Sequence, residues 1–318
     1  MKPVASLSLD LDNQWSYMKT HGDARWEEYP SYLDVAVPRF LGVLDQLGLR
    51  ITVFVVGQDA ALERNGPALR RVADAGHEIG NHSFRHEPWL HLYSDEQVAD
   101  EILRAETAIE AATGMRPRGF RGPGFSLSPT VLKVLQRRGY EYDCSTFPTF
   151  LGPLARAYYL MSSASLPAEE RAKRSQLFGG WREGLRPIDP YRWRWPGGSL
   201  LEIPVTTFPA LRVPIHLSYV LYLSRASPLL ARTYFSAALE ACRRSGTGPS
   251  ILLHPLDFLS GSDVAALSFF PGMSLPIDRK LDCVRRCLSA LARSFEVLPM
   301  GAHARAIERG APRCVEIA

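Results

Sequence analysis

Four side chains that could bind a metal ion stand out in the sequence. Asp10 and Asp12 lie at the end of the first hydrophobic run, and His82 and His86 follow a short apolar segment. One carboxylate and two imidazoles bind a catalytic divalent ion and leave positions open for water and substrate. The second carboxylate is then free to act as a base on that water. The pattern predicts a metal-dependent hydrolase.

Each half of this set has a simpler interpretation when taken alone. Acidic residues at strand ends often cap turns, and a single His-x-x-x-His pair is more often a surface or core feature than a metal site. Together they favour the metal site, because His82 and His86 on one helical turn would share a face. His77 and His91 flank the pair, and we interpret both as structural.

Further candidates surround this set. Arg121, just before a Pro-Gly turn, could hold Asp10 in a fixed orientation, or it could be an ordinary surface arginine. The turn contains Gly124 and Phe125, and we expect a backbone N–H such as that of Phe125 to face an oxyanion.

A histidine and an acid complete the predicted catalytic residues. His254 follows a buried run and could protonate a leaving amine, although a satisfied core histidine would look the same. Asp143 is the nearest candidate to orient His254, an assignment that depends on the predicted topology alone.

The elements that must position these residues alternate between short apolar runs and amphipathic helices. The predicted strands are 6–10, 50–56, 78–81, 119–121, 141–144, 200–205, 250–253 and 295–298, and the helices are 32–47, 66–75, 94–113, 128–138, 231–245 and 278–294. This alternation predicts a parallel α/β fold, and eight strands suggest a (β/α) barrel. Asp10, His82, Arg121, Asp143 and His254 all fall at carboxyl ends of strands, where barrels place their catalytic groups.

We expect residues 1–318 to form one domain with two irregular segments. Residues 148–198 are predicted as an inserted loop region over the site. Residues 209–230 are apolar with interspersed aromatics, and two interpretations stay open. An inward-packed helix is favoured over an exposed apolar ledge for a lipid-like substrate.

Composition narrows the class of protein and its location. With 318 residues, 46% hydrophobic, 22% charged and a net charge of +4 that is scattered, the chain is predicted to be globular, and nucleic-acid binding is not expected. Five cysteines without small-domain spacing favour reduced thiols. The N-terminus runs straight into a strand without a leader, and the apolar run 213–224 is shorter than the roughly twenty residues of a membrane span. We therefore expect a cytoplasmic protein with peripheral membrane contact.

The motifs together resemble the polysaccharide deacetylase superfamily, the NodB-like carbohydrate esterases. The matching segments, in the family's order, are Asp10-Leu-Asp12, Val53–Gly57, His82-Ser-Phe-Arg-His86, Arg121-Gly-Pro-Gly124, Tyr142–Ser145, Leu201–Val205 and Leu253-His254-Pro255. The resemblance implies a distorted (β/α)7 barrel that removes an N-acyl group, usually N-acetyl, from an amino sugar. It implies that Asp12, His82 and His86 bind zinc or a similar divalent ion. Asp10 would be the base, Arg121 its tether and His254 the acid.

Two departures from the family pattern concern the substrate. The first motif is Asp-x-Asp followed by Asn13, which is similar to the subgroup with intracellular and lipid-directed members. The fourth motif lacks the tryptophan common in extracellular deacetylases and has Phe147 nearby. We expect an N-acylated amino sugar or glycolipid at the inner membrane face rather than a polymer. A ureide- or imide-like C–N hydrolase and a silent sugar-binding member stay open as alternatives.

Overall fold

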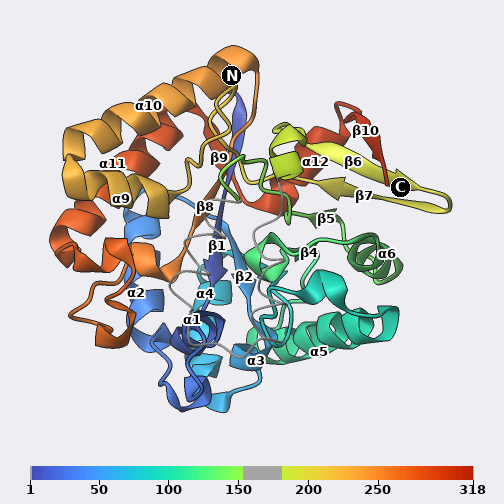
Figure 1. The fold of residues 1–318 in the computed structure, drawn as a ribbon, viewed down its shortest axis with the longest axis horizontal. Coiled ribbons are helices and arrows are strands. Elements are labelled where there is room, and N and C mark those ends of the chain that lie inside the picture. Colours follow the sequence, from blue (N-terminus) through green and yellow to red (C-terminus); the bar gives the residue numbers. More distant parts are fainter. Residues whose placement is uncertain (1, 153–180, 318) are drawn as a thin grey trace.

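Seven parallel strands form the centre of the molecule, which is a computed structural model that describes residues 2–152 and 181–317 (Figure 1). Their order is β8-β1-β2-β3-β4-β5-β7. The bounds are β1 Val4–Leu11, β2 Thr52–Val55, β3 Glu78–Asn81, β4 Gly119–Phe120, β5 Tyr142–Asp143, β7 Gly198–Glu202 and β8 Ser250–Leu253. Residues 153–180 of the expected loop region 148–198 lie outside the described residues.

The series of seven strands is interrupted between β7 and β8. Among the described residues these two strands share no ladder, and they are joined by the segment that follows β7. The Thr206 backbone N–H donates to the Ser250 carbonyl at 3.0 Å, and the Ser250 N–H donates to Thr206 Oγ1 at 2.8 Å. The predicted α/β class is confirmed, and among the described residues no ladder closes the sheet between β7 and β8.

Helices cover the outside of the strands (Figure 1). The α-helices are α1 Gln14–His21, α2 Leu33–Gln46, α3 Gly57–Ala60, α4 Gly66–Asp74, α5 Asp95–Thr113, α6 Pro129–Arg137, α9 Leu217–Ala226, α10 Pro228–Ser245, α11 Ile277–Ser294 and α12 Met300–Glu308. Single 3-10 turns occupy Trp26–Glu28, Glu63–Asn65, Leu90–Leu92, Pro123–Phe125, Trp181–Leu185, Pro255–Asp257, Ala265–Leu267 and Pro271–Ser274.

The helix boundaries follow from local chemistry. Ser94 and Gln97 form a capping box at the start of α5, and Gly114 ends that helix in the left-handed conformation. Ser128 caps α6, with Pro129 in its first turn. Helix α2 has one exposed face and one buried face, and Val37, Phe40 and Leu44 on the buried face pack into the core.

Three strands lie outside the predicted pattern or at its edge. β9 (Glu296–Leu298) pairs with the start of β1, much as predicted. β6 (Tyr191–Trp195) and β10 (Cys314–Glu316) were not predicted, and β6 falls inside the expected loop region. β6 is antiparallel to β7 and buries Tyr191, Trp193 and Trp195 on one face, which is an ordinary strand alternation.

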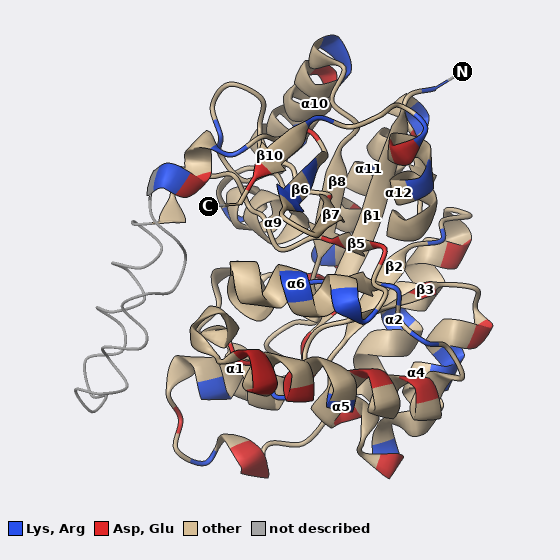
Figure 2. Ribbon diagram, turned by 90° about the vertical axis from the view of Figure 1, so that its right-hand side faces the viewer, with Lys and Arg blue, Asp and Glu red and all other residues tan. Residues whose placement is uncertain are grey.

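The apolar segment 209–230 forms an inward-packed helix over part of its length. Helix α9 buries Leu217, Val220 and Leu221, so the favoured interpretation is correct for that part. Leu229 and Leu230, just beyond it, are 67% and 51% exposed. Charges of both signs are distributed along the outer helices, as α5 shows in Figure 2. Within residues 2–152 and 181–317, no helix combines the length and apolar character needed to span a membrane.

Candidate metal and catalytic site

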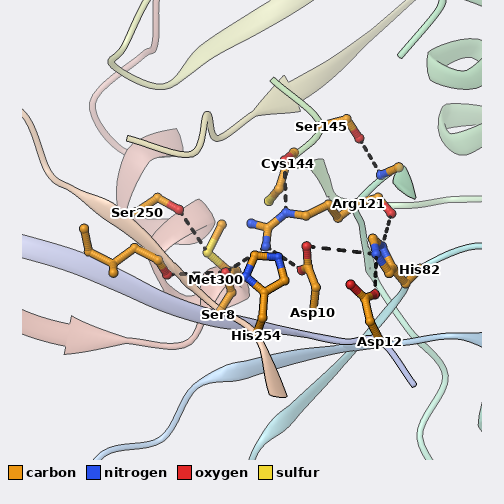
Figure 3. A network of polar contacts seen from close by, with 12 residues as sticks. Ser8, Asp10, Asp12, His82, Arg121, Cys144, Ser145, Ser250, His254 and Met300 are labelled. Carbon is orange, nitrogen blue, oxygen red and sulfur yellow. Dashed lines mark hydrogen bonds and ion pairs between the residues drawn. The ribbon is translucent and has the colours of Figure 1, made fainter. Parts of the chain in front are cut away.

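The carboxyl ends of four strands bring the predicted residues together (Figure 3). β1 contains Asp10 and is followed directly by Asp12, and β3 is followed by His82. β4 is followed by Arg121, and β8 by His254. Parallel strands end at the same rim of a barrel, so residues more than two hundred positions apart become neighbours.

The predicted metal ligands converge on one point. Asp12 Oδ1 lies 3.0 Å from His86 Nε2 and 3.3 Å from His82 Nε2. One ligand atom from each of the three residues lies within 4.8 Å of the others, and all three residues are buried. Asp12 Oδ1 nevertheless accepts no hydrogen bond of ordinary geometry from a described residue. This arrangement fits lone pairs that face a shared cation.

Electrostatics keep the Asp12 carboxyl charged. Burial by itself raises the pKa of this group, but the His86 and His82 rings outweigh burial and hold the pKa well below its usual range. Burial likewise lowers the pKa of His82, yet Asp10 and Asp12 raise it overall. The Asp12 carboxyl therefore stays a carboxylate beside the two rings.

The His82 ring is oriented by a backbone carbonyl. Its Nδ1 lies 2.6 Å from the Arg121 carbonyl oxygen, which can only accept. His82 Nδ1 therefore carries a proton, and the Nε2 lone pair faces Asp12. A backbone carbonyl behind the ring is the usual support of a histidine that ligates a metal.

The segment between the two histidines is a loop, so the predicted helical turn is wrong. Ser83 and His86 have φ angles of 60° and 53°, a left-handed conformation that a helix excludes. Glu101 Oε2 accepts hydrogen bonds from the N–H groups of Phe84 and Arg85, at 3.1 and 2.9 Å, and stabilises the loop. The prediction that the two histidines lie close together is correct, but the helical turn on which it was based does not exist. The supporting role of Glu101 was not predicted.

Arg121 is fully buried and contacts Asp10. Its Nη1 donates to Asp10 Oδ1 at 2.7 Å and to Ser8 Oγ at 3.0 Å, and its Nε donates to the Cys144 carbonyl at 3.1 Å. The guanidinium also lies over the Phe54 ring, 4.5 Å from its centroid. These contacts hold Arg121 as the sequence predicted, beside the proposed base.

The partners of His254 differ from those predicted. His254 Nδ1 lies 3.2 Å from Ser218 Oγ, and Ser218 donates to Asp257 Oδ1 at 2.8 Å. Asp257 Oδ2 also accepts the backbone N–H of His254 at 2.8 Å. Neither Ser218 nor Asp257 was predicted. The spacing of His254 and Asp257, at the N-cap and N3 positions of a short turn, could have identified Asp257.

The predicted pairing of Asp143 with His254 is therefore wrong. Asp143 accepts hydrogen bonds from the backbone N–H of Ser145 at 3.1 Å and from its hydroxyl at 2.7 Å. Asp143 also lies beside Glu202, its partner in the register of β5 and β7. Strand order placed Asp143 on the correct rim, but the direction of its side chain depends on the neighbouring strand β7.

The turn after Arg121 differs from the prediction at one atom. The Phe125 N–H donates to the Gly122 carbonyl at 2.9 Å, so it is already engaged and does not serve an oxyanion. Phe125 and Gly124 both have positive φ angles, 62° and 58°, and both line the cavity described next. The predicted contribution of Gly124 to the site stays a prediction.

A cavity of about 630 Å³ opens beside His254. Its lining is largely aromatic and aliphatic, with Phe147, Tyr219, Tyr222 and Phe270 prominent. Phe125 stacks on Phe147 with ring centroids 4.7 Å apart. A cavity of this size and character is suited to a sizeable apolar group next to the reacting atoms.

The flanking histidines have structural partners. His77 Nδ1 accepts the Ile51 N–H at 3.1 Å, and burial lowers the pKa of His77 to about 4. His91 Nδ1 lies 2.9 Å from Ser126 Oγ at the edge of the cavity. Neither belongs to the metal cluster found among the described residues.

Comparison with known proteins gives the same family as the motifs. Residues 26–142 match the family described as polysaccharide deacetylase. The peptidoglycan deacetylase-like protein FGM2 of Gibberella zeae is 30% identical over 54% of this chain and 51% of its own length. The peptidoglycan deacetylase of Helicobacter pylori is 30% identical over 45% of this chain and 49% of its own. The chain thus spans about half the length of the curated relatives it matches.

A solved structure extends the likeness in fold over the whole chain. A Mycobacterium smegmatis protein assigned to the polysaccharide deacetylases has a TM-score of 0.65 at 20% identity, covering 100% of this chain and 94% of that one. At this identity the likeness concerns the fold alone. Residues 26–142 match the polysaccharide deacetylase family, and the curated relatives above are named as a peptidoglycan deacetylase-like protein and a peptidoglycan deacetylase, so the resemblance that the motifs predicted is confirmed.

Proposed function

We propose that this protein is a metal-dependent amidohydrolase that removes an N-acyl group from an amino sugar. The match of residues 26–142 to the polysaccharide deacetylase family supports sugar N-deacetylation in general terms. The observation that carries the proposal is the convergence of Asp12, His82 and His86 beside Asp10, which Arg121 holds at 2.7 Å.

The residues present fit a divalent ion. Asp12, His82 and His86 would hold it, and their nitrogen and oxygen donors suit zinc with open positions. Such an ion supplies Lewis-acid polarisation and lowers the pKa of water from about 15.7 toward about 7. Orphaned Asp12 Oδ1 supports this fit, because a buried carboxylate oxygen without a donor is costly unless a cation is bound.

The remaining chemistry belongs to the side chains of the protein. Asp10 accepts the proton of the attacking water, and Arg121 fixes the orientation of that carboxylate. His254 donates a proton to the departing nitrogen. Ser218 and Asp257 hold the His254 ring so that its other nitrogen can face the substrate.

The finer part of the proposal concerns the substrate and its location. We propose an N-acyl sugar attached to a lipid, at the cytoplasmic face of a membrane. The apolar cavity beside His254 supports an apolar portion of the substrate, and the departures in the first and fourth motifs favour the same choice over a polymer.

The first experiment is elemental analysis of the purified protein. Wild type should contain about one zinc-like ion per chain, and His86→Ala should lose it. His91→Ala is the matched control, because His91 lies in the same segment and outside the triad. Failure of the wild type to take up any divalent ion on titration would remove the mechanism.

A substrate panel then separates the remaining alternatives. Acyl release is measured on N-acetylglucosamine, its octyl glycoside and a ureide. We expect turnover of the sugars and a preference for the octyl glycoside. Tyr219→Ser, in the cavity wall, should reduce activity on the octyl glycoside and spare the soluble sugar. Equal losses on both would contradict the lipid-linked substrate, and ureide turnover alone would replace the sugar.

A further inference from the structure

Tyr17 has a hydroxyl group that the mechanism above does not use. It lies in the middle of α1, five residues after Asp12. Its Oη is buried and has no hydrogen-bond partner among the described residues. A buried hydroxyl without a partner is rare and calls for a specific explanation.

Other buried tyrosines of the structure have partners for their hydroxyl groups. Tyr32 donates to the Asp12 carbonyl at 2.5 Å, Tyr140 lies 2.7 Å from Asn81 Nδ2, and Tyr142 donates to Glu78 at 3.0 Å. In each of these residues the hydroxyl group is held by a hydrogen bond as well as the ring by packing. Tyr17 differs because only its ring is fixed, by edge-on packing against Phe270 at 5.3 Å.

The surroundings of Tyr17 connect the two halves of the site. Tyr17 lines the cavity together with His254, Asp257 and Gly124. The Asp12 carboxylate lies near the Tyr17 hydroxyl, although the two groups lack the geometry of an ordinary hydrogen bond. The hydroxyl is thus available as a hydrogen-bond donor between the metal ligand Asp12 and the proposed acid His254.

The segment that carries Tyr17 is held firmly. Asn13 caps α1 by accepting the Gln14 N–H at 2.8 Å, and its own amide donates to Asp59 at 2.7 Å. The Trp15 indole donates to the same Asp59 oxygen at 3.0 Å. A donor on such a rigid element is positioned before the substrate arrives, which is what stabilisation of developing charge requires.

We infer that the Tyr17 hydroxyl donates a hydrogen bond to the acyl oxygen of the substrate as that oxygen gains negative charge. This inference depends on the proposed function, and it supplies a donor that the sequence assigned to the Phe125 N–H. That N–H is occupied by Gly122, whereas the Tyr17 hydroxyl is unpaired and lines the cavity.

The test is Tyr17→Phe, which removes one oxygen atom and keeps the ring. On octyl N-acetylglucosaminide we expect kcat to fall by about 100-fold with KM nearly unchanged, since the lost contact strengthens only in the transition state. Metal content should equal that of wild type. The melting temperature of the metal-free protein should be unchanged or higher, because an unpartnered buried hydroxyl is removed.

Tyr29→Phe is the matched control from the same region of the chain. The Tyr29 hydroxyl donates to Asp23 at 2.8 Å and lies outside the cavity, so kcat should stay at the wild-type value. Wild-type kcat in Tyr17→Phe would overturn the inference. A loss carried by KM alone, or accompanied by a lower melting temperature or by loss of metal, would also overturn it.

Failure of the proposed function is recognised separately. If wild type releases no acyl group from any sugar, acetate serves as a probe, and its binding to zinc-titrated wild type and Tyr17→Phe is measured by calorimetry. Several-fold weaker binding in Tyr17→Phe supports the hydroxyl as a donor to an acyl oxygen. Equal affinity overturns it.

Discussion

Two pairs of buried carboxylates lie on the same rim of the barrel and have opposite surroundings. Asp10 lies near the end of β1 and Asp12 directly follows it. Arg121 contacts Asp10, and His82 and His86 contact Asp12. Asp143 and Glu202 end β5 and β7 side by side. Their partners are the neutral donors Ser145, the Thr146 N–H and the Trp193 indole.

The surroundings decide the protonation of each pair. Burial, and then the negative charge of Asp143, raises the pKa of Glu202 well above its usual value, whereas the pKa of Asp12 is held low. Glu202 therefore holds its proton more tightly than an ordinary glutamate does, and Asp12 stays a carboxylate. An acidic residue at a strand end therefore indicates a catalytic or metal site only when its partners are cationic or imidazole groups that keep it ionised.

The largest expected effect is on kcat, and it should differ between a substitution in the Asp10/Asp12 pair and one in the Asp143/Glu202 pair. Asp10→Asn removes the proposed base, so kcat should fall by about 10²–10⁴-fold. Asp143→Asn should lower kcat by less than about 10-fold, because Asp143 contacts Ser145 and Glu202 rather than the triad. Acyl release on octyl N-acetylglucosaminide is the measurement for both variants.

Metal content and folding provide the controls for this pair of variants. Both should retain about one metal ion per chain, since Asp12, His82 and His86 are intact. Asp10→Asn should also lower the free energy of unfolding, because the fully buried Arg121 guanidinium loses its counter-charge. Similar losses of kcat in the two variants would contradict the division of roles between the carboxylate pairs.

A smaller effect concerns the pH dependence of stability. Glu202 has a folded-state pKa above its usual 4.5. The folded protein then binds this proton more tightly than the unfolded chain does. The stabilising contribution is complete below pH 4.5 and is lost as pH rises through the folded-state value.

Glu202→Gln removes this titration. At pH 5 the variant should be less stable than wild type by about 1–3 kcal/mol. Glu202 accepts hydrogen bonds on both of its oxygens, from the Thr146 N–H and the Trp193 indole, whereas an amide has only one oxygen that can accept. Between pH 5 and pH 8 the wild type should lose stability relative to the variant, so the difference narrows. Chemical denaturation at pH 5 and at pH 8 measures the difference in free energy of unfolding between wild type and variant. The same difference at both pH values would contradict the raised pKa of Glu202.

The fold was largely predictable because burial patterns and helix caps are local. β3 and β8 have the predicted bounds, and α5 begins one residue after the predicted start at residue 94 and ends at the predicted residue 113. β6 was missed although its aromatic residues alternate, because it lies in a stretch interpreted as a loop. The seam between β7 and β8 depends on two hydrogen bonds between Thr206 and Ser250, which no local pattern reveals.

The site was predictable in its members and less so in its contacts. The order of strands places Asp10, Arg121 and His254 on one rim. Which side chain supports another depends on rotamers and on segments distant in sequence. Ser218, in an apolar helix, orients His254, and positive φ angles at Ser83 and His86 replace the helical turn. Neither feature has a periodic signal.

The smallest expected effect tests a fifth buried carboxylate, Asp257, which extends the comparison. Burial raises the pKa of Asp257, and it contacts His254 through Ser218 and through the His254 backbone N–H. Ser218→Ala breaks only the side-chain connection, so one hydrogen bond worth about 0.5–1.5 kcal/mol is lost. We expect kcat to fall about 3–10-fold with metal content unchanged.

The direction of the Ser218→Ala effect distinguishes orientation from simple packing. If Ser218 orients the His254 ring, the loss should appear in kcat and the pH optimum should shift, because the ring loses its hydrogen-bond partner. Ser218→Thr, which keeps the hydroxyl, should recover most of kcat. Equal activity of Ser218→Ala and wild type would mean that Asp257 fixes the backbone of His254 and leaves its ring unconstrained. The rim would then contain one pair of carboxylates that serves the reaction, Asp10 and Asp12, and three further acids that only support the loops.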